Sequence, residues 1–278
     1  MFKKNYSKKT YDLDRVDENH NLHRIKNDLG WIYQDYNNIN PLISIYWFDN
    51  ELKNICFPWV LKLERQFKAY FIKLYKQSFQ TNNADSFLDK ANFNKKKCDD
   101  KKVNKIIANI EEILKNKNTN NIDELVFALT FGEFVTTILN FNESMFYKFA
   151  HHFGLMPDVF NNILKYLNIL RNAIAHNKSI IKIIDEKNNK RFSIKLNFFL
   201  FHISKIEADI LSTNAAGIIY VIYRLINSPN SKKHKDFIRD IKKLLLKLKR
   251  NINNNEIFNL FMKKIFLNYQ KEILECLI

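Results

Sequence analysis

The sequence predicts an all-α fold: a helical bundle with additional C-terminal helices. Only 4 glycines and 4 prolines occur among 278 residues, too few for the regularly spaced turns of an all-β protein. Hydrophobic residues make up 46% of the chain, which is enough to form a sizeable core. Several long segments repeat their apolar residues every three or four positions, the spacing of amphipathic helices.

Residues 1–54 are expected to form a basic N-terminal arm followed by an aromatic-rich cover. Residues 1–20 are polar and basic and have no hydrophobic period. Residues 22–50 are rich in aromatic side chains and are interrupted by Gly30 and Pro41. They are compatible with two short helices or with an irregular cover.

Residues 55–180 are expected to form the helical core. The first helix should follow Pro58, because proline is tolerated in the first turn of a helix. Residues 81–102 are polar and charged and are expected to form a loop or a mobile insertion. Further helices are predicted over 103–118, 122–141, 143–154 and 157–177, with Asn121 or Asp123 as an N-cap and Gly154 as a stop signal.

Residues 181–278 are expected to form a third part, made of a β-hairpin and basic helices. Two β-prone runs within 180–200 flank the polar stretch DEKNNK, which indicates a small hairpin. Helical spacing returns at about 203–227, 232–250 and 255–276.

The strong positive charge predicts a polyanionic partner. Lys and Arg number 45 against 29 Asp and Glu, a formal net charge of +16. Such a chain favours nucleic acid first and an anionic membrane surface second. No signal peptide and no apolar run long enough to span a membrane is found, so a cytoplasmic protein with no membrane association is expected.

The cysteines and acidic residues give no metal-site pattern. Cys56, Cys98 and Cys276 are scattered, form no CxxC pair and have no histidine at metal-ligand spacing. We expect buried or incidental thiols in a reducing compartment, no metal site and no cofactor.

One helix carries a distinctive pair in the segment LRNAIAHNKS, residues 170–179. At 100° per residue, a polar stripe runs through Lys165, Asn168, Asn172 and His176. Arg171 lies about 140° from His176 around the same helix. The two side chains therefore meet only if the arginine reaches around the helix or if a second copy of the helix completes the pair. The simpler alternative is a border arginine and a surface histidine at a helix C-terminus.

Three segments resemble the AbiD/AbiF-type abortive infection proteins of the HEPN superfamily. These are LERQFKAYF (63–71), ELVFALTFGEFVTTI (124–138) and FGLMPDVFNNILKYLNILRNAIAHN (153–177), in the family's order and spacing. The last contains the Arg-x4-His signature of the superfamily. The resemblance covers roughly 55–180; it leaves 22–50 unmatched and the C-terminal hundred residues only loosely matched.

The resemblance implies a HEPN-like helical core and association with RNA in defence against phage. The wider superfamily includes metal-independent ribonucleases with a composite site built from two HEPN units. Carried onto this chain, Arg171 and His176 become the candidate catalytic pair, with Asn172 beside them. A histidine can move the proton of a 2′-hydroxyl or a leaving 5′-oxygen, and an arginine fork can stabilise charge on phosphoryl oxygens.

Basic and amide side chains supply the candidate RNA contacts. The C-terminal helix contributes most of them, because 231–250 holds nine Lys or Arg and two Asp. A solvated helix face, a membrane-lying helix and a partner helix are the alternatives for this segment. The candidates are Lys165, Asn168, Asn177, Lys178, Arg65, Lys68, Lys232, Lys233, Lys235, Arg239, Lys242 and Lys243. Glu64 either supports Arg171 or simply pairs with Lys68 at i, i+4.

Two functions remain open from the sequence, and a third class is weaker. The chain is either a HEPN-type endoribonuclease and toxin, or a non-cleaving module that holds a structured small non-coding RNA. A homodimer through the Arg-x4-His helix would serve the first. A purely structural helical scaffold would carry no nucleic acid.

Overall fold

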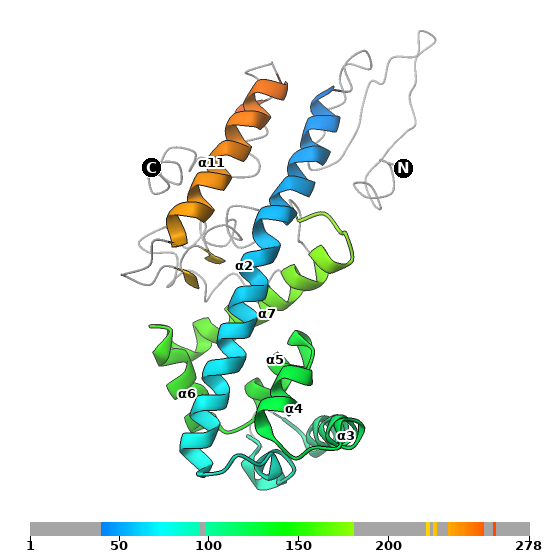
Figure 1. Ribbon diagram of the computed structural model, residues 1–278, viewed down its shortest axis with the longest axis vertical. Helices are drawn as coiled ribbons and strands as arrows, with labels where there is room; N and C mark the ends of the chain where they lie inside the picture. Colours follow the sequence, from blue (N-terminus) through cyan, green and yellow to red (C-terminus); the bar gives the residue numbers. More distant parts are fainter. Residues whose placement is uncertain are drawn as a thin grey trace. The chain divides into compact units, whose positions relative to one another are not determined.

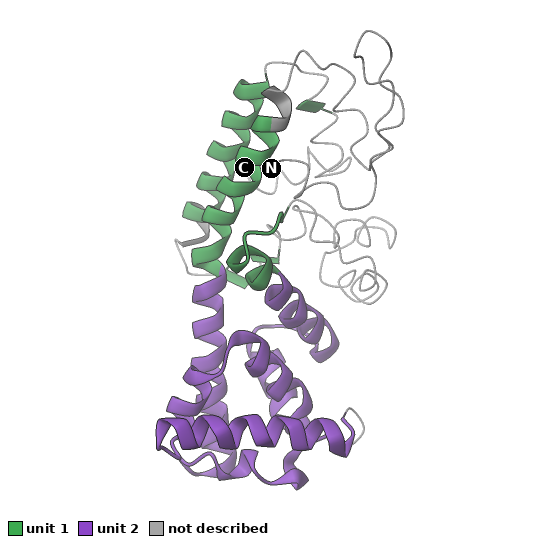
Figure 2. Ribbon diagram, turned by 90° about the vertical axis from the view of Figure 1, so that its right-hand side faces the viewer, with its two compact units in different colours: residues 1–59, 170–194, 204–278 green, residues 60–169, 195–203 purple. Residues whose placement is uncertain are grey.

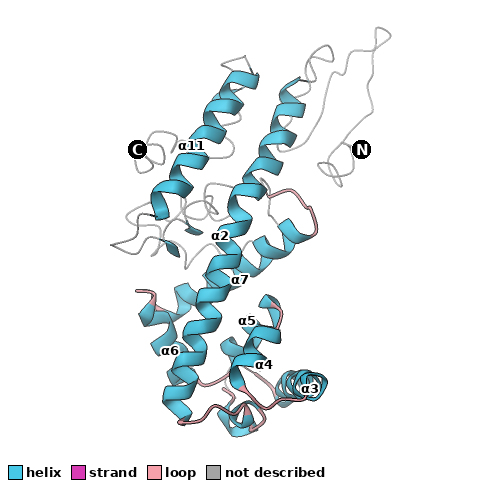
Figure 3. Cartoon of the chain, viewed as in Figure 1, coloured by secondary structure: helices cyan, strands magenta, loops and turns pink. Residues whose placement is uncertain are grey.

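The computed structural model describes residues 40–94, 98–180, 221–222, 225–226, 233–252 and 258–259. Within these ranges the regular structure is seven α-helices and two short 3-10 helices, with no strand (Figure 1, Figure 3). This confirms the all-α prediction. The expected hairpin and the N-terminal arm lie outside the described residues.

The described chain forms two compact units, drawn in different colours in Figure 2. Unit 1 comprises residues 1–59, 170–194 and 204–278, and unit 2 comprises residues 60–169 and 195–203. Two helices contribute to both: α2 (Asn40–Phe79) and α7 (Pro157–Ala175). The predicted three-part division of the sequence stays a prediction.

Helix α2 begins well before the predicted start. It spans 40 residues and contains Pro58 in its interior, so the expectation of a helix beginning at Pro58 is wrong. A proline there cannot donate to the carbonyl of Asn54. Both residues are exposed, so water can satisfy that carbonyl. The buried residues Ile45, Phe48 and Leu52 continue the helical spacing of the apolar face through residues assigned to the irregular cover.

Unit 2 is organised around an aromatic core. Phe67 of α2 meets Phe149, Phe153 and Phe160 edge to face, with ring centroids 4.9–6.1 Å apart. These rings come from α2, from α6 (Glu143–His152) and the turn after it, and from α7. Helix α6 ends at His152, and the predicted stop residue Gly154 follows with a φ of 67°, the left-handed conformation that glycine adopts freely.

The polar segment after α2, described over residues 80–94, has both regular structure and buried side chains. It contains two 3-10 helices, Asp85–Phe87 and Lys90–Asn92, and its side chains at Phe87 and Phe93 are buried. Phe87 packs on Phe141, with ring centroids 4.3 Å apart. Helix α3 (Asp100–Lys117) follows, with Asp99 accepting from the backbone N–H of Lys102 at its start.

The predicted helix over 122–141 is two helices, α4 (Ile122–Ala128) and α5 (Phe131–Asn140). Asn121 caps α4, as expected. The break is made by Thr130, whose side chain accepts from the N–H of Glu133 while the Glu133 carboxylate accepts from the N–H of Thr130. This reciprocal pair of hydrogen bonds is a capping box, and its T-x-x-E motif can be read in the sequence.

In unit 1, the first half of α2 packs with α11 (Lys233–Ile252), which confirms the helix predicted over 232–250. Trp59 meets Phe237 edge to face at 5.8 Å, and Lys247 lies 4.0 Å from the centre of the Trp47 ring. The two helices are therefore antiparallel. Among the described residues, no helix has both the length and the hydrophobicity needed to cross a membrane.

We expect Thr130→Ala to lower the free energy of unfolding by about 1 kcal/mol, because it removes the acceptor that caps α5. Urea unfolding followed by circular dichroism measures the change. Thr136→Ala, at an exposed position inside the same helix, is the matched control and should change stability by less than about 0.5 kcal/mol. Equal losses in both variants would show that the capping box does not stabilise the start of α5.

Candidate functional site

The candidate site is built around the C-terminal end of α7. Along this helix Lys165 and Asn172 are exposed, Asn168 is half-buried, and Leu167 and Leu170 are buried. The polar stripe predicted from the sequence is therefore the outward side of the helix. Asn168 is partly covered because Gly132 of α5 approaches it so closely that an added Cβ would lie 3.3 Å from its Oδ1.

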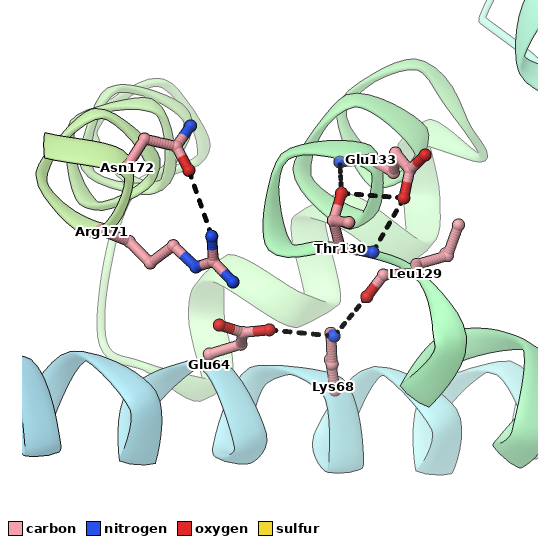
Figure 4. A network of polar contacts seen from close by, with 7 residues as sticks. All are labelled: Glu64, Lys68, Leu129, Thr130, Glu133, Arg171 and Asn172. Atoms are coloured by element: carbon pink, nitrogen blue, oxygen red, sulfur yellow. Dashed lines mark hydrogen bonds and ion pairs between the residues drawn. The ribbon is translucent and has the colours of Figure 1, made fainter. Parts of the chain in front are cut away.

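Arg171 is half-buried and points its guanidinium toward the neighbouring amide. Its Nη1 donates to Oδ1 of Asn172 at 3.4 Å, a long contact (Figure 4). The side chain of Asn172 thus contacts the arginine, whereas its backbone carbonyl accepts the helical bond from the N–H of His176.

His176 is the exposed residue at which α7 ends. The N–H of Asn177 donates to the carbonyl of Ile174 at 2.9 Å, and the N–H of Lys178 donates to the carbonyl of Ala173 at 2.7 Å. Together with φ of 49° at Asn177, these bonds form a Schellman motif that closes the helix. The backbone that carries His176 is therefore well defined. No described residue hydrogen-bonds to its imidazole, and no hydrogen bond joins it to Arg171.

A buried ion pair in unit 1 holds the turn after His176. Lys53 donates to Asp49 at 3.1 Å and to Oδ1 of Asn177 at 3.0 Å, and the side chains of Lys53 and Asp49 are only 8% and 2% exposed. Asp49 also accepts from the Ser179 hydroxyl and from the N–H of Ile180, at 3.1 and 2.8 Å. Sequence reasoning missed both charged residues. Their i, i+4 spacing was visible, but both residues lie within 1–54, the part expected to form an arm and an aromatic-rich cover.

Glu64 and Lys68 form a second buried pair, in unit 2. Lys68 donates to Glu64 at 3.0 Å and to the carbonyl of Leu129 at 2.6 Å, the carbonyl next to the break between α4 and α5 (Figure 4). Lys68 is 4% exposed. A buried ammonium engaged in this way is not placed to bind a phosphate, so Lys68 leaves the set of candidate RNA contacts. The simple alternative for Glu64, its pairing with Lys68, is present.

Helix α11 separates its charges by position along its length. Arg239 pairs with Asp236 at 2.9 Å and approaches Asp240 at 3.5 Å, so its charge is compensated. Beyond Asp240 the helix has no acidic residue. Its exposed cations there are Lys243, Lys247, Lys249 and Arg250, of which only Lys243 was among the predicted contacts.

The remaining predicted contacts are distributed as follows. Arg65 and Lys178 are exposed, whereas Lys242 is half-buried. The side chains of Lys233 and Lys235, and the whole of Lys232, lie outside the described residues. So does Cys276, while Cys56 and Cys98 are free and buried, as expected. No group of three or more His, Cys, Asp or Glu capable of holding a metal occurs in the described part of the chain.

Comparison with known proteins gives one match. Residues 30–182, more than half of the chain, match the family model described as Abi-like protein. No curated protein and no solved structure matches the chain.

We expect Lys68→Met to lower the free energy of unfolding by about 3–5 kcal/mol, because it removes the buried ammonium that donates both to the Glu64 carboxylate and to the Leu129 carbonyl. Chemical denaturation measures the loss. Lys73→Met, at an exposed position on the same helix, is the control and should change stability by less than about 0.5 kcal/mol. A small loss in Lys68→Met would mean that water reaches the pair.

Proposed function

This chain belongs to the Abi-like family of abortive infection proteins, which act in defence against phage, and on that premise we propose that it is a metal-independent HEPN-type endoribonuclease. The observation that carries the proposal is the end of α7, where Arg171, Asn172 and His176 lie within one helical turn and a half. An exposed imidazole there can move a proton of an RNA ribose or leaving group at neutral pH. Arg171 supplies a fixed cation for the phosphoryl oxygens.

A second copy of the chain would complete the proposed active site. Arg171 turns toward Asn172, and no bond joins it to His176 within the described residues. Two α7 ends brought together in a homodimer would set the arginine of one chain beside the histidine of the other. Each copy would then supply its own exposed His176 and the positive charge nearby.

The same observation supports one alternative, a module that holds RNA without cleaving it. A catalytic imidazole is usually oriented by a second group that hydrogen-bonds to it. No described residue does this for His176. Arg171, Asn172 and His176 would then bind the RNA backbone, and the partner would be a structured small non-coding RNA.

We further propose that the C-terminal half of α11 binds the phosphate backbone of the RNA. Its exposed cations lack acidic partners among the described residues. Its apolar face, formed by Ile241, Leu244, Leu245 and Leu248, is 0–6% exposed and is therefore not available to insert into a lipid bilayer. Leu246, at 58% exposed, lies outside that face. This favours a polyanion bound from solution over a membrane surface.

We expect Arg171→Ala and His176→Ala each to lower the RNA cleavage rate by at least about 100-fold in the presence of EDTA, since each removes a group that acts in the transition state. Cleavage is measured with labelled single-stranded RNA, and RNA retention is measured by the absorbance ratio of the purified protein. His151→Ala, an exposed histidine in unit 2, is the matched control and should retain full activity.

These assays separate the candidate functions. Lost cleavage with retained RNA supports the endoribonuclease. A wild-type protein that retains RNA but never cleaves it, and loses the RNA in both variants, supports the holding module. A wild-type protein that neither retains nor cleaves RNA would contradict both.

We expect the triple change Lys243→Gln, Lys247→Gln and Arg250→Gln to reduce the slope of log K against log salt by about 2, because each lost phosphate contact contributes about 0.7 for a single strand. Fluorescence anisotropy at several salt concentrations measures the slope. Changing Lys105, Lys115 and Lys117 of α3 to Gln removes the same charge and is the control. An unchanged slope in the α11 variant alone would remove α11 from the RNA-binding surface.

A further inference from the structure

We infer that Asn177 presents a fixed hydrogen-bond donor next to His176, directed at a phosphate oxygen of RNA, and that Lys53 and Asp49 are the positioning residues that fix it. This inference rests on the proposed function, because it names how the same site recognises its polyanion.

The backbone of Asn177 is held in one conformation. Its φ is 49°, in the left-handed region that asparagine tolerates better than most residues, and its N–H closes the end of α7 by donating to Ile174. The Cα of Asn177 is therefore fixed relative to His176. Only the rotation of its side chain remains to be set.

Lys53 sets that rotation. An ammonium group has hydrogen-bond donors and no acceptor, so it can engage only the oxygen of the Asn177 amide. The contact from Nζ to Oδ1 is 3.0 Å. Because the amide is planar, its Nδ2 is then directed away from Lys53. No described residue accepts from this group, and the residue is exposed.

Asp49 makes this arrangement stable. The Lys53 side chain is 8% exposed, and a buried ammonium needs an anion beside it. Asp49 supplies that anion through Oδ2, and through Oδ1 it holds Ser179 and Ile180. The turn that carries Asn177 is thus fastened on both sides, at the amide and at the residues that follow.

The chemistry at this surface favours an anionic acceptor. The outward group of Asn177 is an NH₂ donor, and the residues on either side of it are the exposed His176 and Lys178. These groups can all donate hydrogen bonds, and none of them is an anion. A phosphate group offers several acceptor oxygens to such donors, whereas a protein or base donor offers none.

The decisive variant is Asn177→Asp. An aspartate tolerates the left-handed backbone and keeps an oxygen toward Lys53, but its second oxygen replaces the outward donor. We expect the dissociation constant for a fluorescein-labelled, mixed-sequence single-stranded RNA to rise about tenfold or more, with thermal unfolding unchanged.

Two further variants separate charge and structure from recognition. Asn118→Asp adds the same charge at the end of α3, where Asn118 is also left-handed with φ of 48°, and RNA affinity should change less than about twofold. Asn177→Gly keeps the left-handed backbone and removes the donor without adding charge, so affinity should still fall about tenfold.

The positioning role of Lys53 is tested by hydrogen exchange, independently of RNA. Lys53→Met should accelerate exchange of the amides at 177–180 by at least about tenfold, and Lys53→Arg should restore protection. Lys102→Met is the matched control, because Lys102 donates to Oδ1 of Asn140 at the same distance of 3.0 Å in unit 2. It should leave the amides at 177–180 unchanged.

The failures are distinguishable. If the wild-type protein binds RNA and Asn177→Asp binds equally well, the donor is refuted and the proposed function stands. If the wild-type protein binds no RNA, the proposed function and the RNA acceptor fall together. Unchanged exchange at 177–180 in Lys53→Met refutes the positioning role, whatever the RNA assays give.

Discussion

The buried pair of Asp49 and Lys53 is the constraint on which the candidate site depends. Two charges removed from water are stable only when their remaining hydrogen-bonding capacity is used, and here it is used on the segment after α7. Leu or Met side chains in place of Asp49 and Lys53 would bury a similar volume, but they would make no hydrogen bonds that fix the position of residues 177–180. The ion pair therefore selects one position for the turn that carries His176.

The capping bonds of α7 and this pair act on the same few residues for different reasons. The Schellman motif fixes the backbone at Asn177 through local bonds to Ile174 and Ala173. The contacts to Lys53 and Asp49 join residues separated by more than 120 positions in the sequence. Local bonds can form in an isolated helix, whereas long-range ones require unit 1 to be folded. The geometry of the site is therefore coupled to the folding of the first half of α2.

Periodicity and helix signals predicted much of this fold, and the errors have physical causes. The family resemblance, the all-α class, the cap at Asn121 and the stop at Gly154 are confirmed. The early start of α2 was missed because Pro58 resembles a first-turn proline. It lies instead inside the helix, where the carbonyl that loses its helical donor, that of Asn54, belongs to an exposed residue. The break at Thr130 was missed because the apolar spacing continues across it. The T-x-x-E pattern of the capping box is the one sequence signal that indicates a new helix start there.

Whether a charged residue is buried is difficult to predict from a single sequence, and burial decides whether that residue stabilises the fold or is available to bind a partner. Lys68 and Arg65 lie three positions apart on α2, yet Lys68 is buried against Glu64 and Leu129 and Arg65 is exposed. The sequence indicates the pairing of Lys68 with Glu64 but not its burial, because its other contact, the Leu129 carbonyl, comes from the break between α4 and α5. Arg239 and Lys243 differ in a similar way, through the acidic residues within reach of each.

The separation of Arg171 from His176 has a consequence for how such a protein could be kept inactive. If catalysis needs an arginine from one copy and a histidine from another, a single chain holds each group in a fixed position but not the pair. Folding alone would then not generate activity, since the pair forms only when two α7 ends meet. While most chains are monomeric, activity would rise with the square of the protomer concentration. An RNA or protein that covers the α7 end would suppress activity without disturbing either side chain. A well-defined turn at residues 176–180 would favour such a dimer, because a preorganised half-site loses little conformational freedom when the second chain binds.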